Sequence, residues 1–501
     1  MPRVDFGERR PICHDGPAGR ELTRATGHRM ADDDPPRDHW SLAAGRLRTL
    51  ARGGIAIGVV LGFDRLDAGS AVVDAGALTQ LFSLHRFALV FGVAAPAMLG
   101  LVVWSLPAQL HAANLSLPRL AAFGWWSWLV GSVIVLVSYL GNGGPGGGDA
   151  QYVETYLLGL GIVLVALAVI AVSVAATVLT RRNGRALSDV PIGAFAALVT
   201  ALGVVLTLPV ALGTIIYVWL DYVNARVAFG GADLIDTWLG WVTREPHTLL
   251  VVVPALGVLA DAVVRTARGR QPLRGVVLIG VGISLSVVAS SATQQAHVFA
   301  LGDTPTGTLQ SLVPYALFNL VPLLAPLVVV LLSLLALRAG TPGISGAFVA
   351  AFLGVGMIFT GLVGSAAMHL DALGLVGTVF GEATLVYVVY GAVLAAIGGI
   401  TLHAGSVTGR ALPDGKVVLI ALLGFVATVL ASLPHYVAGF LDQPANVASG
   451  FDDSGLVGVT NVIVALGHLL MLVAMLGFVG LVVTSRRGDV VTDRYRVEQP
   501  A

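Results

Sequence analysis

The sequence predicts an all-α integral membrane protein, a bundle of twelve transmembrane helices, and three observations carry this prediction. The chain has 501 residues, of which 56% are hydrophobic and only 12% charged. Its mean hydropathy of +0.85 is far outside the range of a soluble domain. Apolar runs of membrane-spanning length recur along the chain, and basic and acidic residues alternate between the segments that join them.

Each apolar run is expected to form one helix. A bilayer core requires about twenty apolar residues per helix, and a backbone surrounded by lipid must satisfy its own hydrogen bonds. The first run is the weakest, since Asp64 and Arg65 interrupt it. In order, the twelve runs are roughly residues 50–73, 84–106, 121–141, 155–180, 191–217, 247–266, 274–296, 311–337, 344–366, 374–402, 415–437 and 456–484.

The charges of the connecting segments predict the orientation of the helices, because short cytoplasmic loops are rich in Lys and Arg. Basic residues precede the first run and follow the even-numbered runs: Arg46, Arg48, Arg52, Arg119, Arg181, Arg182, Arg185, Arg268, Arg270, Arg274, Arg338, Arg410, Lys416, Arg486 and Arg487. The intervening loops carry acidic residues instead: Asp149, Glu154, Asp221, Asp233, Asp236, Asp303, Asp371, Asp442, Asp452 and Asp453. Both termini are therefore expected in the cytoplasm of a prokaryote-like cell, with the chain multi-pass in its cytoplasmic membrane.

The predicted organisation is one membrane domain between two polar tails. Residues 1–45 form a polar cytoplasmic tail, residues 46–485 the twelve-helix domain, and residues 486–501 a second cytoplasmic tail. The first thirty residues lack the apolar core of a signal peptide, and Met30 is an alternative start to Met1.

Composition also excludes several classes of function. The formal net charge is zero and the basic residues lie in short loops rather than in one cluster, which argues against nucleic-acid binding. The single cysteine, Cys13, cannot form an intrachain disulfide or a cysteine-rich metal site. The partners to expect are the lipid bilayer and other membrane proteins.

Ionisable residues inside membrane segments are costly and usually functional, and five of them are predicted to lie in the outer part of the membrane. These candidates are His85, Glu245, His247, His297 and Glu382. Glu382 is expected in the middle of a helix, where a carboxylate needs a partner or a water-filled hollow. Glu245, His247 and His297 could form a mixed site for Zn, Fe or Mn; alternatively Glu245 is solvated at the interface and His247 bonds a neighbouring helix.

Two segments connect His85 to a known family. The run QLFSLHRFALVFG places His85 at the start of the second helix, and PAQLHAANLSLPRLA, residues 107–121, follows it. Together they resemble the second and third helices of subunit I of the haem-copper oxidases, which include cytochrome c oxidase and quinol oxidase. In that family the histidine at this position binds the low-spin haem, so the resemblance makes His85 a candidate axial ligand of haem.

The stretch WVTREPHTLLVVVPALG, residues 241–257, resembles the sixth helix of the same family. The residues that match in register are Trp241, Pro246, Pro254, Ala255 and Gly257. The functional residues differ, because Glu245 stands at the family's copper-binding histidine, His247 at its proton-carrying glutamate and Leu249 at its cross-linked tyrosine.

The remaining cofactor positions are mostly exchanged as well. The segment QQAHVFALG resembles the family's pair of copper-binding histidines, with His297 in the second place and Ala296 in the first. The two haem-binding histidines of the tenth helix fall on Ala383 and Leu385, beside Glu382. The two arginines that hold the haem propionates fall on Ala445 and Asn446 in LPHYVAGFLDQPANV.

The resemblance covers roughly residues 78–484 and leaves two hypotheses about function. On the first, the chain is a degenerate member that acts as a membrane scaffold or partner of respiratory-chain subunits, without standard oxygen reduction or proton pumping. On the second, it is a redox subunit that holds haem with altered ligation and passes electrons from cytochrome c or quinol to oxygen or another small molecule. The missing ligands favour the first hypothesis and argue against copper, while haem on His85 remains open.

Overall fold

The computed structural model describes residue 58 and residues 75–145, 148–224, 248–269, 271–293, 298–409, 411–446 and 455–485. Within these ranges the protein is helical, and ten helices are long and apolar enough to cross a membrane by length and composition. This confirms the predicted all-α membrane fold. The first predicted run lies outside the described residues except for Gly58, and so do both predicted tails.

The first half of the described bundle consists of long helices. The second predicted run is a continuous rod of α2 (Ala75–Phe87), a π-helical segment (Ala88–Ala94) and α3 (Ala95–Leu110). It is followed by α4 (Pro118–Leu140), α5 (Ala150–Thr180), α6 (Ile192–Val223), a π-helical segment (Thr248–Val252) and α8 (Val253–Ala267).

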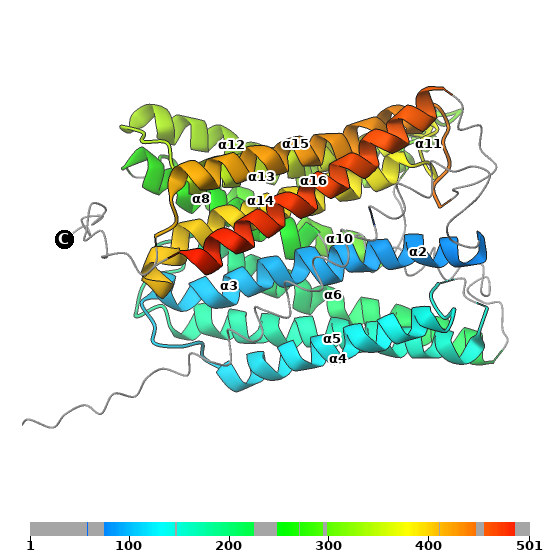
Figure 1. Cartoon of the computed structure of the whole chain (residues 1–501), viewed down its shortest axis with the longest axis horizontal. Coiled ribbons are helices and arrows are strands. Elements are labelled where there is room, and N and C mark those ends of the chain that lie inside the picture. The colour runs from blue at the N-terminus through cyan, green and yellow to red at the C-terminus, as the bar shows by residue number, and fades with distance from the viewer. Residues whose placement is uncertain are drawn as a thin grey trace, which may run out of the picture. The chain divides into compact units, whose positions relative to one another are not determined.

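The second half contains the helices that complete the bundle (Figure 1). They are α9 (Arg274–Ile283), α10 (Ser286–Thr293), α11 (Pro305–Tyr315), a π-helical segment (Ala316–Leu320), α12 (Val321–Ala339), α13 (Gly346–Met368), a short 3-10 turn (Asp371–Leu373), α14 (Phe380–Thr408), α15 (Asp414–Gly439) and α16 (Leu456–Thr484).

Two elements differ from the sequence-based expectation. The seventh run is not one helix but two short ones, α9 and α10, separated at Ser284 and Leu285, where glycine and serine residues of low helix propensity gather. The tenth helix begins at Phe380 rather than near residue 374, because Gly374 and Gly377 adopt left-handed φ values of 62° and 85°, which end regular helix.

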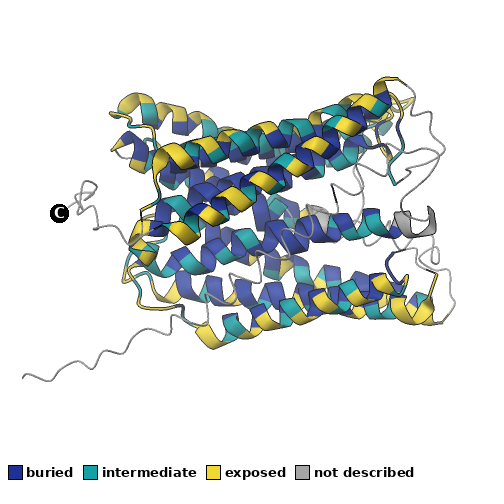
Figure 2. Ribbon diagram, in the orientation of Figure 1, coloured by how far each residue is buried: buried dark blue, intermediate teal, exposed yellow. Residues whose placement is uncertain are grey.

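The most enclosed of the membrane-spanning helices are α14, the segment Thr248–Ala267 that contains α8, and the α2–α3 rod. In the apolar 18-residue stretch of each, 83%, 83% and 78% of the residues are buried. Figure 2 shows buried residues turned towards the interior of the bundle and exposed ones along its outer faces. Large apolar side chains on α4, including Phe123, Trp126 and Leu140, are exposed, as expected for surfaces that meet lipid tails.

Helices α13 and α14 are neighbours that approach through small residues. A Cβ atom on Gly354 would lie only 2.5 Å from the Gly391 carbonyl oxygen, and one on Gly391 would lie 2.6 Å from the Gly354 carbonyl oxygen. The two backbones therefore touch directly, a mode of packing typical of membrane helices. This contact fixes α14, the helix that carries several of the candidate residues.

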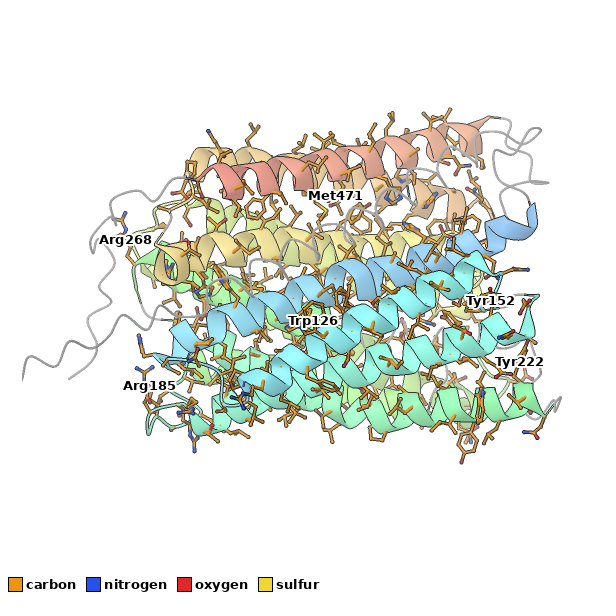
Figure 3. The ribbon with its side chains drawn as sticks, turned by 60° about the horizontal axis from the view of Figure 1, so that its bottom comes forward. Trp126, Tyr152, Arg185, Tyr222, Arg268 and Met471 are labelled. Carbon is orange, nitrogen blue, oxygen red and sulfur yellow. The ribbon has the colours of Figure 1, made fainter. Side chains whose placement is uncertain are left out.

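Two of the loops predicted to be cytoplasmic lie at the same end of the bundle. Arg185 and Arg268 lie at one end of the bundle and Tyr152 and Tyr222 at the other (Figure 3). Arg185 follows the fourth predicted run and Arg268 the sixth. Their position at the same end of the bundle agrees with the two membrane crossings predicted between them. The assignment of that end to the cytoplasm stays a prediction.

Candidate functional site

His85 lies inside the bundle, in the last turn of α2 and directly before a π-helical segment. Its side chain is buried. Wide π-type turns are rare and often lie beside functional residues. The ring of His85 contacts the ring of His468, with centroids 5.6 Å apart and planes at 82°, an edge-to-face arrangement.

His468 and Tyr390 extend this contact across two further helices. His468 comes from α16 and Tyr390 from α14, and both side chains are buried. A hydrogen bond of 2.5 Å joins the Tyr390 hydroxyl to Nδ1 of His468, and the two rings also meet edge to face at 5.6 Å. The buried hydroxyl and imidazole thus satisfy each other, as polar groups removed from water must.

Gly58 contacts both histidines from the first predicted run. A Cβ atom at this position would lie 2.8 Å from Nε2 of His85 and 3.0 Å from Nδ1 of His468. Only glycine allows this approach. We refer to Gly58, His85, Tyr390 and His468 as the ring cluster.

The sequence pointed to His85 but not to its neighbours. The sequence around His468 contains no second ligand at metal-binding spacing. The signal that could have found it is its place near the middle of a 29-residue apolar helix, where an ionisable residue needs a partner from another helix.

Glu382 lies in the first turn of α14 and is half-buried. This corrects the expectation of a carboxylate in the middle of a helix. The difference follows from the later start of α14, and it changes the energetics, because a carboxylate is favoured near a helix N-terminus by the backbone dipole. A water-filled hollow is no longer needed to explain the residue.

The two positions that the resemblance gives to haem-binding histidines in α14 lack ligating atoms. Ala383 is fully buried and Leu385 is partly buried, and neither side chain has a nitrogen, oxygen or sulfur atom. Leu249, at the place of the cross-linked tyrosine, is also fully buried. It packs against α6, where a Cβ on Gly203 would lie 2.8 Å from its Cδ1.

The segment expected to hold the haem propionates is built differently. Asn446 has a left-handed φ of 61°, and its side-chain oxygen accepts a hydrogen bond from the guanidinium of Arg86. The neighbouring Gln443 is tied to α14 through its carbonyl, which accepts from the Val379 N–H at 3.0 Å. A guanidinium is therefore present near this segment, but it comes from the residue after His85 and is bonded to an amide.

The proposed mixed metal site, Glu245, His247 and His297, lies outside the described residues. Within the described part of the chain no group of three or more His, Cys, Asp or Glu side chains could hold a metal ion. A separate histidine, His369 at the C-terminal end of α13, forms a hydrogen bond of 2.8 Å between its Nδ1 and the Ser365 carbonyl oxygen.

A second polar group, which the sequence did not suggest, surrounds Asp261 at the opposite end of α14 from Glu382. The Asp261 carboxylate accepts a hydrogen bond of 3.0 Å from the Gly193 N–H at the start of α6. Gln109 lies beside it, since a Cβ on Gly193 would be 3.1 Å from the Gln109 Oε1. Nε2 of Gln109 approaches His403 Nε2 at 3.5 Å and donates to Ser105 at 3.0 Å. This Asp261 cluster joins α3, α6, α8 and α14.

Comparison with known proteins gives one consistent family. Residues 49–485 match the family model described as cytochrome c and quinol oxidase polypeptide I. Among individual proteins, the chain is similar to quinol oxidase subunit 1 of Bacillus spizizenii, 23% identical over 51% of this chain and 42% of that protein. It is also similar to cytochrome c oxidase subunit 1 of Corynebacterium glutamicum, 26% identical over 82% of this chain and 73% of that protein.

The match to the quinol oxidase spans less than half of that protein's length, whereas the family model covers nearly all of the predicted membrane domain. The helical bundle and these matches agree. The chain is a multi-pass membrane protein that belongs to the cytochrome c and quinol oxidase polypeptide I family, the haem-copper oxidase subunit I family.

Proposed function

We propose that this protein is a non-catalytic member of its family, a membrane scaffold or partner of respiratory-chain subunits in a prokaryotic cytoplasmic membrane. It keeps the helical framework and has lost the oxygen-reducing centre. Standard oxygen reduction and coupled proton pumping are not part of this function.

The observation that carries the proposal is that apolar side chains, Ala383 and Leu249, occupy the positions of a haem-binding histidine and the cross-linked tyrosine. Both side chains are fully buried in the bundle. A haem iron in the oxygen-reducing centre needs a ligand from the protein, and a methyl group and an isobutyl group offer none. Because Leu249 packs directly against the backbone of α6 at Gly203, its place is occupied by core packing.

The loss of copper ligands supports the same conclusion. In the aligned positions only His297 remains as histidine, with Glu245 and Ala296 in the other two places. Imidazole is the ligand type suited to copper, and a carboxylate with a single imidazole is a weaker set. We infer that copper is not the metal of this protein, and that Glu245, His247 and His297 remain the candidates for any other divalent ion.

The second candidate function is a haem-binding redox subunit with altered ligation. Two buried imidazoles, His85 and His468, contact each other inside the bundle. This observation favours it over other non-scaffold functions. On this alternative electrons would pass through haem from cytochrome c or quinol to a small molecule.

Oxygen consumption by the purified full chain tests the proposal. The protein in mild detergent is supplied with reduced cytochrome c or with a quinol, and an oxidase preparation from Corynebacterium glutamicum serves as the positive control. We expect no cyanide-sensitive oxygen uptake above the detergent background, because the reducing centre lacks its ligands. Cyanide-sensitive turnover would refute the proposal.

A complementation experiment tests the scaffold role itself. Deleting the chain in its host should lower the amount of assembled respiratory oxidase, measured as haem absorbance of washed membranes. The wild type and the Glu245→Ala/His297→Ala variant should restore it equally, because a scaffold does not need those donors. Restoration by the wild type alone would assign a function to the mixed site instead.

A further inference from the structure

The ring cluster lies where the resemblance places the low-spin haem. His85 is the residue that would bind its iron. A haem can occupy this place only if there is enough space around Nε2 of His85. What we infer from that space rests on the proposed function.

The space next to Nε2 does not fit a haem. The iron would lie about 2 Å from the ligating nitrogen, as in other metal–imidazole bonds, and the flat macrocycle would extend around it on all sides. In this structure a Cβ atom added to Gly58 would lie 2.8 Å from Nε2 of His85 and 3.0 Å from Nδ1 of His468. The Gly58 backbone, one covalent bond from that position, and a second imidazole therefore lie within the region that the macrocycle needs.

The ring cluster is also a complete packing arrangement by itself. His468 contacts His85 and Tyr390 edge to face, each at 5.6 Å between centroids, and such ring pairs stabilise proteins beyond their buried area. The hydrogen bond between Tyr390 and His468 satisfies two polar groups for which lipid offers no hydrogen-bond partner. Three helices, α2, α14 and α16, are joined to one another through these contacts, and Gly58 lies against two of the rings.

We infer that the ring cluster replaces the low-spin haem as the link between these helices, and that His85 is retained as a packing residue rather than as an iron ligand. His468 fills the volume beside His85, and Tyr390 holds its ring in place. Gly58 is the residue at which the backbone can approach both imidazoles closely.

Substitution of Gly58 tests the close approach. Gly58→Ala places a methyl group 2.8 Å from Nε2 of His85, a distance that real Cβ contacts do not reach, so we expect the apparent unfolding temperature in detergent to fall by roughly 5 °C. Gly92→Ala is the matched control, since a Cβ on this buried glycine meets no atom within 4 Å, and it should leave the transition temperature unchanged or raise it. Equal stability of the Gly58→Ala variant and the wild type would overturn the inference.

Haem binding gives a second, independent measurement. The full chain is purified from cells supplied with haem precursor, and its absorption spectrum is recorded oxidised and dithionite-reduced, with a pyridine haemochrome assay for haem content. We expect no stoichiometric low-spin haem, and added haemin should bind the wild type and the His85→Ala variant alike.

One spectroscopic outcome overturns the inference without touching the proposed function. A stoichiometric six-coordinate low-spin spectrum that disappears in both His85→Ala and His468→Ala would show an iron held between the two imidazoles. If oxygen uptake were still absent, the chain would remain non-catalytic in oxygen reduction. Oxygen uptake would refute the proposed function, whatever the state of the ring cluster.

Discussion

At the scale of single residues, Asp261 shows how a partly buried charge can serve the fold. Its carboxylate satisfies the Gly193 N–H at the N-terminus of α6, where the first backbone N–H groups of a helix have no partner within the helix. An acceptor there is typically worth about 1 kcal/mol. Arg265 lies one helical turn away on α8 and attracts the same carboxylate electrostatically, which offsets part of the cost of removing the negative charge from water.

Two substitutions separate the acceptor from the charge. Asp261→Asn keeps an oxygen that can accept from Gly193, whereas Asp261→Ala leaves that N–H unsatisfied, which costs about 1–3 kcal/mol in a buried setting. We expect the alanine variant to unfold at the lower temperature of the two in a detergent thermal scan. Equal losses would mean that the interaction with Arg265, and not the hydrogen bond, determines the stability of this cluster.

The candidate site was only partly predictable from single residues. His85 could be found because it matches a family motif at one position. Its neighbours Tyr390 and His468 come from helices more than three hundred residues further along the chain, and no local spacing relates them to it. Contacts of this kind are set by helix packing, which the apolar pattern of a membrane segment does not encode.

At the scale of helices, the sequence was a good guide where apolar length alone decides. Ten of the twelve predicted runs correspond to helices long enough to span a membrane within the described residues. The prediction was wrong where local backbone chemistry intervenes, at the break between α9 and α10 and at the start of α14 after Gly374 and Gly377. Hydropathy does not report such features, because they depend on φ and ψ rather than on polarity.

The contact between α13 and α14 predicts opposite effects on stability for alanine substitutions at two nearby glycines of α13. Gly354→Ala forces a methyl group to within 2.5 Å of the Gly391 carbonyl oxygen, so the helices must separate and the yield of monodisperse protein should fall. Gly356→Ala on the same helix meets nothing within 4 Å and should be neutral or stabilising, since alanine is favoured over glycine in helices by about 1 kcal/mol. The measurement is size-exclusion chromatography of both variants from equal amounts of cells. Similar profiles for the two variants would contradict the direct backbone contact.

At the scale of the whole molecule, the proposed function requires the bundle to hold together without the oxygen-reducing centre of its family. In a membrane protein the helices are held by close packing and interhelical polar contacts, and this chain supplies both through its α13–α14 contact, its Asp261 cluster and its ring cluster. The α13–α14 contact joins consecutive helices, whereas the Asp261 cluster and the ring cluster join helices that are distant in sequence. Internal contacts of this kind can supply the cohesion that a large buried prosthetic group would provide, so the proposed loss of ligands is compatible with the fold.

The orientation of the bundle is the last prediction, and it depends on charge. Arg185 and Arg268 lie at one end (Figure 3), and the excess of basic residues in short loops places that end in the cytoplasm. Green fluorescent protein fused after the C-terminus should therefore fluoresce, and alkaline phosphatase inserted at Gly148 in the opposite loop should be active, because each reporter works on only one side of the membrane. A phosphatase that is active at Arg185 and inactive at Gly148 would invert the topology. His85 and the start of α14 would then face the cytoplasm, and any partner subunit that contacts this end of the bundle would have to be sought on that side.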